Sequence, residues 1–244
     1  MRGNITRGAG YLTRGARLLN HPSLRTFVII PLVINILIFG SLIGIGFRYI
    51  SDLMDSMLSR VPDWLSFIQW ILWPVIAITV SLIVGYLFTM VALIIASPFN
   101  ALLAEKAEEL ITGQPVDSLE GLGAALLAIP RGVWRELVKL LYYIPMAIFV
   151  LLLSFIPGVG AVAWLLLGAW MMSIQFVDYP MDNHQFSFAE VKAAVRSRRL
   201  SSLGFGGLVA LCTGIPLVNF FVVPAAVVGA TLLWCEELKG SLDQ

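Results

Sequence analysis

The sequence predicts an all-α integral membrane protein, and three observations support this fold class. Of the 244 residues, 59% are hydrophobic and 13% are charged, whereas about 25% of a soluble domain is charged. Four long uncharged runs, at residues 26–47, 64–104, 140–177 and 200–235, are separated by polar segments, and the last two runs are interrupted by turns rich in Gly and Pro. We therefore expect a single membrane domain over residues 1–244. It would contain two full transmembrane helices, two half-penetrating (re-entrant) helical hairpins and amphipathic cytoplasmic helices.

The composition also excludes several classes of function. The formal net charge is +1, which predicts no nucleic-acid partner. The cysteines and histidines do not stand at metal-ligand spacing, and Cys212 and Cys235 both lie in apolar runs, where packing is the usual role of a cysteine. The sequence has no phosphate loop of the GxxxxGK type and no motif with a defined catalytic mechanism. We expect a protein that is not an enzyme and that uses no cofactor, metal or ATP.

The first 25 residues carry five arginines and no acidic residue. By the positive-inside rule, this end of the chain is cytoplasmic. Tyr11 and Leu12 alternate with Arg14 and Arg17, and this pattern has two interpretations. One is a short interfacial helix; the other is a basic tail that only fixes the topology.

The first predicted crossing occupies residues 24–47. Its uncharged run has 22 residues, enough for one crossing at about 20 residues each, and Ser23 is a suitable N-cap. Residues 48–63 hold two basic and three acidic side chains, which fits the outer side of the membrane. The apolar periodicity of this segment predicts that the helix continues beyond the bilayer and ends at Pro62.

The second predicted crossing occupies residues 75–96. It lies in an uncharged run of 41 residues, long enough for one very long helix or for two shorter ones. Pro74 is the expected position of a kink or of a new helix start. The sequence SPFN at residues 97–100 is expected to mark the return to the cytoplasm.

A cytoplasmic helical layer is predicted between residues 101 and 139. Glu105, Lys106 and Glu109 alternate with apolar residues at helical spacing, and the sequence GQP at 113–115 ends that helix. A second amphipathic segment begins near residue 124, and a third around 187–196. The simplest interpretation of these charges is a solvated helix face.

The third and fourth runs predict the re-entrant hairpins, at residues 142–177 and 201–235. In the third run, the turn IPGVG and Pro145 leave halves of 12 and 17 residues. In the fourth, breaks at 213–216 and 219–224 leave halves of 11 and 14 residues, which reach only about 16 and 21 Å as helices. The hydrocarbon core is about 30 Å thick. Four short but complete crossings are the competing interpretation.

The two hairpin turns also share a sequence, IPGV at residues 156–159 and IPLV at 215–218. Paired interrupted segments of this kind are typical of a transport pathway. No Asp, Glu, Lys, Arg or His lies inside the apolar runs that predict the crossings and hairpins, which favours a passive channel over a proton-coupled carrier.

An anion that enters such a pathway needs polar groups that replace its hydration shell. An arginine beside a helix N-terminus suits a divalent oxyanion, because the guanidinium and the unpaired backbone N–H groups converge there. The first place with this pattern has four residues: Ser23, Leu24, Arg25 and Thr26. The second is the pair Arg198 and Arg199, which precedes a glycine-rich segment containing Gly204, where an anion can approach the backbone closely. Topology signalling with lipid-phosphate contact is the alternative for both places.

Six segments of the chain resemble the CysZ family of bacterial sulfate permeases. They are residues 31–35 (PLVIN), 97–106 (SPFNALLAEK), 178–180 (DYP), 198–206 (RRLSSLGFG), 215–219 (IPLVN) and 224–231 (PAAVVGAT). The resemblance covers nearly the whole chain in order. It implies an all-helical fold with two long transmembrane helices and two hairpins that penetrate part of the bilayer, assembled as an oligomer.

The resemblance also implies positions for the site. The family binds sulfate near a basic pair at the start of the first long helix, and in the matching place here Arg25 is the one basic residue of the pair. The helix after SPFN is associated by resemblance with the pore lining, which implies pathway roles for Glu105, Lys106 and Glu109. Carboxylates in an anion path need a cationic partner, and Lys106 or an arginine is the expected one.

The function that this resemblance implies is sulfate uptake across the bacterial inner membrane by a channel-like permease that feeds cysteine biosynthesis. The expected partners are sulfate, membrane lipids and further copies of the chain, because two half-depth hairpins do not enclose a full-length pore. The main rival is a membrane scaffold or assembly protein whose hairpins wedge one leaflet. A lipid-modifying enzyme is a third class, because re-entrant helices also occur there.

Overall fold

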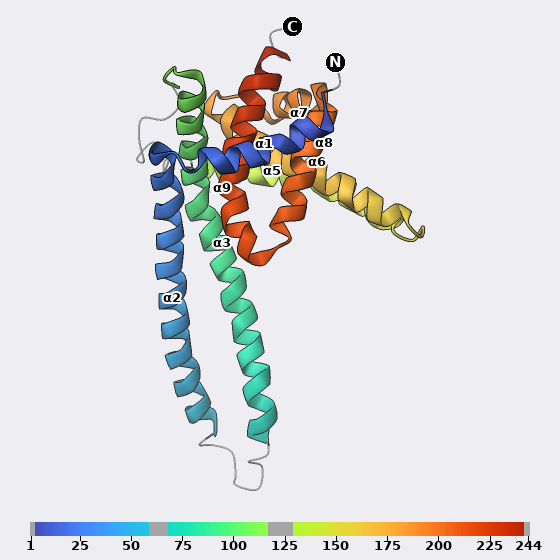
Figure 1. The fold of residues 1–244 in the computed structure, drawn as a ribbon. Helices are drawn as coiled ribbons and strands as arrows, with labels where there is room; N and C mark the ends of the chain where they lie inside the picture. Colours follow the sequence, from blue (N-terminus) through green and yellow to red (C-terminus); the bar gives the residue numbers. More distant parts are fainter. Residues whose placement is uncertain (1–2, 59–67, 117–128, 242–244) are drawn as a thin grey trace. The chain divides into compact units, whose positions relative to one another are not determined.

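The computed structural model describes residues 3–58, 68–116 and 129–241, and every regular element in these ranges is helical (Figure 1). The chain divides into two compact units: residues 29–96 form one, and residues 1–28 together with 97–244 form the other. The prediction of an all-α protein is confirmed.

Two long helices contain the predicted crossings. Helix α2 spans Pro22–Leu58 and helix α3 spans Ile68–Thr112. The predicted continuation of the first helix past residue 47 is confirmed, whereas its expected end at Pro62 lies outside the described residues. Of the two arrangements considered for the long run, the structure has the single helix, which continues through Pro74. The helix also runs through the sequence SPFN, so this sequence does not interrupt the backbone.

The predicted ends of these helices are partly correct. Helix α3 ends where GQP predicted: Gly113 has a φ of +70° and its N–H donates to the Glu109 carbonyl at 2.8 Å, the conformation in which glycine follows a helix without a Cβ clash. The prediction of Ser23 as an N-cap is wrong, because α2 already begins at Pro22. Proline is well tolerated at the first helical position, where its missing N–H would have no intrahelical partner.

The first hairpin consists of α5 (Ile129–Leu153) and α6 (Val159–Asn183), joined through Gly158 with a φ of +80°. The turn is where the sequence predicted it, but the expected shortening at Pro145 is wrong, since α5 continues through this residue. Each helix has 25 residues and is therefore about 37 Å long. The half-penetrating depth of the hairpin stays a prediction.

The second hairpin consists of α8 (Arg199–Thr213) and α9 (Pro216–Leu233). The predicted turn between them is confirmed, but the second break at 219–224 is wrong, because α9 runs unbroken through Pro224. Helix α8 has 15 residues, or about 22 Å, and α9 has 18 residues, or about 27 Å. A π-helical turn and a short 3₁₀ turn follow, η2 (Trp234–Leu238) and η3 (Lys239–Ser241).

The amphipathic helix predicted around residues 187–196 is confirmed. Helix α7 spans Phe188–Ser197 and begins with a capping box: the Ser187 side chain accepts from the Glu190 N–H, and the Glu190 carboxylate accepts from the Ser187 N–H. This pairing satisfies two backbone donors at the helix start. The helix connects the first hairpin with the second.

The N-terminal arginine-rich segment forms helix α1 (Ile5–Leu18), so the predicted helix is confirmed, and its place at the membrane interface stays a prediction. Figure 1 shows it lying across α8 and α9, and glycines make this close packing possible. A Cβ on Gly8 would lie 2.0 Å from the Ser201 carbonyl oxygen, and a Cβ on Gly204 would lie 2.1 Å from that of Ile5. The buried face of α1 also contributes Tyr11 to the hydrophobic core.

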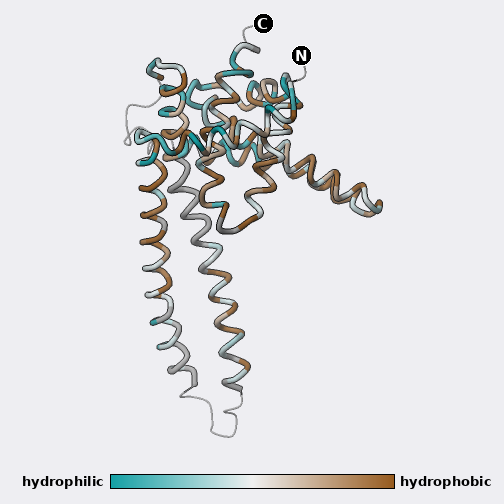
Figure 2. Tube along the Cα trace, viewed as in Figure 1, coloured by the Kyte–Doolittle hydropathy of each residue, from teal (hydrophilic) through white to brown (hydrophobic). Residues whose placement is uncertain are grey.

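The apolar surface of the molecule agrees with a membrane environment. By length and hydropathy, four described stretches are able to cross a bilayer: Pro22–Gly46, Pro130–Leu153, Val159–Asn183 and Val218–Leu238. The α5–α6 hairpin is hydrophobic along most of its length (Figure 2), and Phe155 at its tip is 83% exposed. A soluble monomer does not expose to water an apolar surface as long as this hairpin. The chain is a multi-pass integral membrane protein.

Candidate functional site

The predicted anion site lies in the first turn of α2. Arg25 and its neighbours Ser23 and Thr26 are exposed, whereas Leu24 is fully buried in the core. Leu24 thus anchors the turn and leaves the polar side chains outside. The Arg25 N–H donates to the His21 carbonyl at 3.3 Å, and no hydrogen bond or ion pair to another described residue occupies its guanidinium. These side chains are available to an oxyanion at the positive end of the helix dipole.

The predicted pathway residues of α3 form one ion-pair cluster. The Lys106 ammonium lies 2.9 and 2.8 Å from the two Glu109 carboxylate oxygens and 3.4 Å from Glu105. The hydrogen bond that its ammonium donates to Glu109 raises the pKa of Lys106, so the ammonium stays charged. The carboxylates therefore have the cationic partner that the sequence predicted. Their role in a pathway stays a prediction.

The second predicted anion place is at the corner between α7 and α8. Arg199 is exposed and its Nε donates to the Arg196 carbonyl at 3.3 Å, while Arg198 is half-buried. Gly204 is buried against the backbone of α1, with the Ile5 carbonyl in the space of a Cβ. Gly204 therefore allows α8 to pack closely against α1, and the α1 backbone blocks an anion from this side of the glycine.

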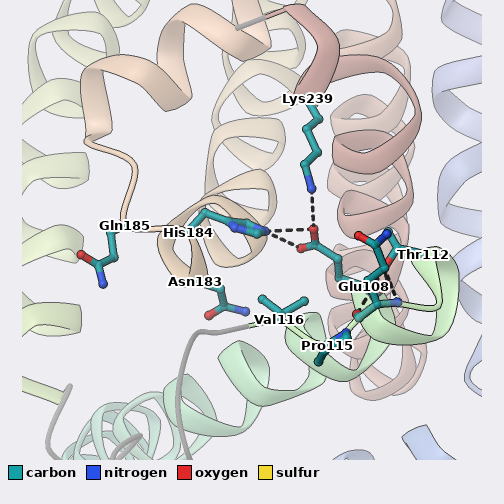
Figure 3. Close-up of a pocket in the computed structure, with 9 residues that line it drawn as sticks. Glu108, Thr112, Pro115, Val116, Asn183, His184, Gln185 and Lys239 are labelled. Atoms are coloured by element: carbon teal, nitrogen blue, oxygen red, sulfur yellow. Dashed lines mark hydrogen bonds and ion pairs between the residues drawn. The ribbon is translucent and has the colours of Figure 1, made fainter. Parts of the chain in front are cut away.

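A polar pocket that the sequence did not predict lies around Glu108 (Figure 3). It has a volume of about 400 Å³ and is lined from three segments of the chain: the end of α3, the turn after α6, and Lys239. The Glu108 side chain is 1% exposed, and its two oxygens lie 2.9 and 3.0 Å from the Nε2 of His184. The Lys239 ammonium lies 3.4 Å from the same carboxylate.

The electrostatics of this pocket keep Glu108 ionised. Burial raises the pKa of a carboxyl group, but the hydrogen bond from His184 and the charges of His184 and Lys239 outweigh it, so the pKa of Glu108 is lowered. The neighbouring residue Gln185 has a φ of +61°, uncommon for a residue with a Cβ. This turn geometry accompanies the placement of His184 against Glu108. No sequence pattern indicates this pair, since the two residues are 76 positions apart.

A second unpredicted cluster joins the two helices of the first hairpin. Arg135 of α5 makes a bidentate contact with Asp178 of α6, and Lys139 lies 3.1 Å from the same carboxylate. One turn away, Arg131 pairs with Asp182 at 2.8 Å. Asp178 and Lys139 are both buried, so these charges fix the relative position of α5 and α6. In the sequence, these basic residues of α5 are four positions apart, and so are the two aspartates of α6. This matched spacing could have indicated the ion pairs.

Comparison with known proteins identifies close relatives. The family described as "Sulfate transporter CysZ/Etoposide-induced protein 2.4" matches residues 11–224. A protein named "Sulfate transporter CysZ" from Pseudomonas aeruginosa PAO1 is 46% identical over 233 residues, which cover 94% of this chain and 95% of the relative. One of the same name from Pseudomonas fluorescens Pf0-1 is 44% identical over 236 residues, covering 96% and 94%.

Proposed function

This chain belongs to the Sulfate transporter CysZ/Etoposide-induced protein 2.4 family, and from that membership we propose that it takes up sulfate across the bacterial inner membrane. The observation that carries the proposal is the extent of the similarity: relatives named as sulfate transporters are 44–46% identical over 94–96% of the chain. The exposed apolar hairpin and the long apolar helices support a place in the membrane. Uptake of this kind would feed cysteine biosynthesis.

The mechanism that we propose is channel-like and independent of nucleotide hydrolysis. The sequence carries no GxxxxGK loop for ATP. The clustered charges of the described residues lie at helix ends and hairpin bases, as with Lys106 and Arg135, and give no continuous relay for protons through the apolar runs. Sulfate would therefore move down its electrochemical gradient.

The first sulfate contact would be the α2 turn of Ser23, Leu24, Arg25 and Thr26. Its support is the exposed guanidinium of Arg25, which has no acidic partner among the described residues, next to exposed hydroxyls and a helix start. A guanidinium donates in a planar fork that fits two oxygens of a tetrahedral anion. Charge-assisted bonds of this type offset part of the lost hydration of sulfate.

The passage beyond this contact would use the Lys106 cluster and the corner of Arg198 and Arg199. In the cluster, Lys106 neutralises Glu105 and Glu109, which reduces the repulsion that two bare carboxylates would exert on sulfate. The second hairpin has only 15 and 18 residues in its helices. We propose that both hairpins penetrate only part of the bilayer; hairpins of that depth do not enclose a pore, so we expect several copies of the chain to assemble around it.

Sulfate uptake by purified protein in liposomes tests this function. We expect radiolabelled sulfate to accumulate inside vesicles that contain the protein, without ATP, and to stop accumulating when the imposed gradient is spent. Vesicles without protein and vesicles with Arg25→Ala protein are the controls. A well-folded wild-type protein that admits no sulfate would contradict the proposal and favour a membrane scaffold whose hairpins wedge one leaflet.

A further inference from the structure

A shallow groove lies at the end of α1, just before α2. It has a volume of about 370 Å³ and is lined by Arg14, Arg17, Leu18 and His21. Arg14, Arg17 and Leu18 are three and four residues apart, the spacing that places side chains along one face of α1, and His21 follows in the turn between α1 and α2. Of the four lining side chains, Arg14, Arg17 and His21 are basic or titratable, and Leu18 is apolar.

The groove carries an excess of positive charge. Arg14 is held by Glu236, with its Nη1 at 3.0 Å from a carboxylate oxygen, and Arg7 pairs with Glu237 at 3.1 Å. These contacts leave Arg17 as the arginine of α1 with no acidic partner among the described residues. The sequence has no acidic residue before Asp52, so no nearby carboxylate on this part of the chain balances it. An anion would be attracted to this groove.

The donors of the groove are directed by local contacts. The Ser23 N–H donates to the Nδ1 of His21 at 3.4 Å, which leaves Nε2 as the nitrogen that carries the proton in the neutral ring. Arg17 is exposed and presents a guanidinium with five N–H donors. Arg14, whose Nη groups face Glu236, supplies charge more than free donors.

The depth of the groove in the bilayer follows from the sequence. The uncharged run of the first crossing begins at Thr26, five residues after His21, and Leu18 adds an apolar wall. Basic side chains immediately outside an apolar crossing lie at the level of the lipid phosphates. We propose that this groove binds the phosphodiester headgroup of an anionic phospholipid such as phosphatidylglycerol. A phosphatidylcholine headgroup is disfavoured, because its ammonium group would face Arg14 and Arg17.

Native mass spectrometry of the detergent-solubilised chain, with phosphatidylglycerol and phosphatidylcholine as probes, tests the proposal. We expect phosphatidylglycerol to bind more tightly, and Arg17→Gln to weaken its binding about fivefold, as the loss of one basic charge near the lipid surface predicts. Adding His21→Gln to the Arg17→Gln variant should weaken phosphatidylglycerol binding further. The matched control is Arg196→Gln, which removes another exposed arginine far from the groove in sequence and should leave binding unchanged.

Three results would overturn the proposal. The first is equal affinity for the two lipids. The second is unchanged phosphatidylglycerol binding by the Arg17→Gln, His21→Gln double variant, shown to be folded by its unaltered gel-filtration profile. The third is displacement of phosphatidylglycerol by sodium sulfate at an ionic strength held constant with sodium chloride. That displacement would identify the groove as part of the entry for free sulfate.

Discussion

The buried carboxylate of Glu108 is hydrogen-bonded to His184, with both of its oxygens within 3.0 Å of the imidazole Nε2. An ionised carboxylate only accepts hydrogen bonds, so the Nε2 of His184 carries a proton in this contact. The pair connects the end of α3 with the turn after α6, and Lys239 adds the C-terminal segment at 3.4 Å. One side chain thus links three parts of the sequence that are far apart.

This contact makes the stability of the protein sensitive to acid. The pKa of Glu108 is lowered in the folded state below the 4.5 of an unperturbed glutamate, so its stabilising contribution is present above about pH 4.5 and is lost as the pH falls through the folded pKa. Glu108→Gln should reduce the stability at pH 7 by about 1–3 kcal/mol, because it removes charge-assisted hydrogen bonds.

Thermal unfolding of both proteins between pH 3 and pH 7 measures this effect, and we expect the difference between them to shrink below pH 4.5. Glu109→Gln is the matched control, since Glu109 and its partner Lys106 are both only partly buried; ion pairs that solvent reaches contribute about 0–1 kcal/mol. A constant difference over the whole pH range would contradict the assignment.

The packing of α1 on the second hairpin predicts opposite effects for two glycines of the same helix. Gly8→Ala places a Cβ 2.0 Å from the Ser201 carbonyl oxygen, and such overpacking should destabilise the protein by about 1–3 kcal/mol. Gly10→Ala meets no atom within 4 Å and should raise the stability by up to about 1 kcal/mol through helix propensity. Apparent melting temperatures in detergent report both changes, and equal values would refute this packing.

The proposed sulfate contact predicts a specific loss of affinity. Arg25→Ala removes a charged donor, and hydrogen bonds to charged groups contribute about 1.5–3 kcal/mol, so sulfate binding should weaken at least about tenfold. Isothermal titration of the protein in detergent measures this affinity. Arg196→Ala is the control. If Arg25→Ala binds sulfate as the wild type does, the contact belongs instead to Arg198 and Arg199.

The ion pairs inside the first hairpin predict a large effect at one acidic residue and a small one at its neighbour. Asp178→Ala leaves the half-buried Arg135 and the buried Lys139 without a shared carboxylate, which should destabilise the protein by about 3–5 kcal/mol. Glu136→Ala removes an exposed acid that also contacts Lys139, and should change the stability by less than about 1 kcal/mol. Chemical unfolding in mixed micelles compares the two, and similar losses would rule out the structural role of Asp178.

The depth of the first hairpin can be measured by cysteine labelling. In a Cys212→Ser, Cys235→Ser background, Phe155→Cys at the tip of the α5–α6 hairpin should resist membrane-impermeant maleimide from both sides if the hairpin penetrates only part of the bilayer. Gln185→Cys, in the exposed turn after α6, is the control for the cytoplasmic side. Labelling of the tip from the side opposite the N-terminus would show a complete crossing.

The helices were largely predictable because hydropathy and helix-ending residues act locally. The turn at Gly158 and the end of α3 at Gly113 both follow from residues that tolerate a positive φ. The prolines were less informative. Pro145 and Pro224 were expected to interrupt helices, yet both lie inside them. In membrane helices, neighbouring groups and small adjustments satisfy the freed carbonyl, so the local rule that proline ends a helix loses force.

The sequence alone determined the membrane environment, the helical fold class and the turns of both hairpins, because each of these depends on residues within a few helical turns. The tertiary structure decided which distant groups meet. It paired Glu108 with His184, placed Asp178 between Arg135 and Lys139, and used Gly204 for the contact with α1. These contacts join separate helices, and their geometry depends on how the chain packs, which no local pattern of residues encodes.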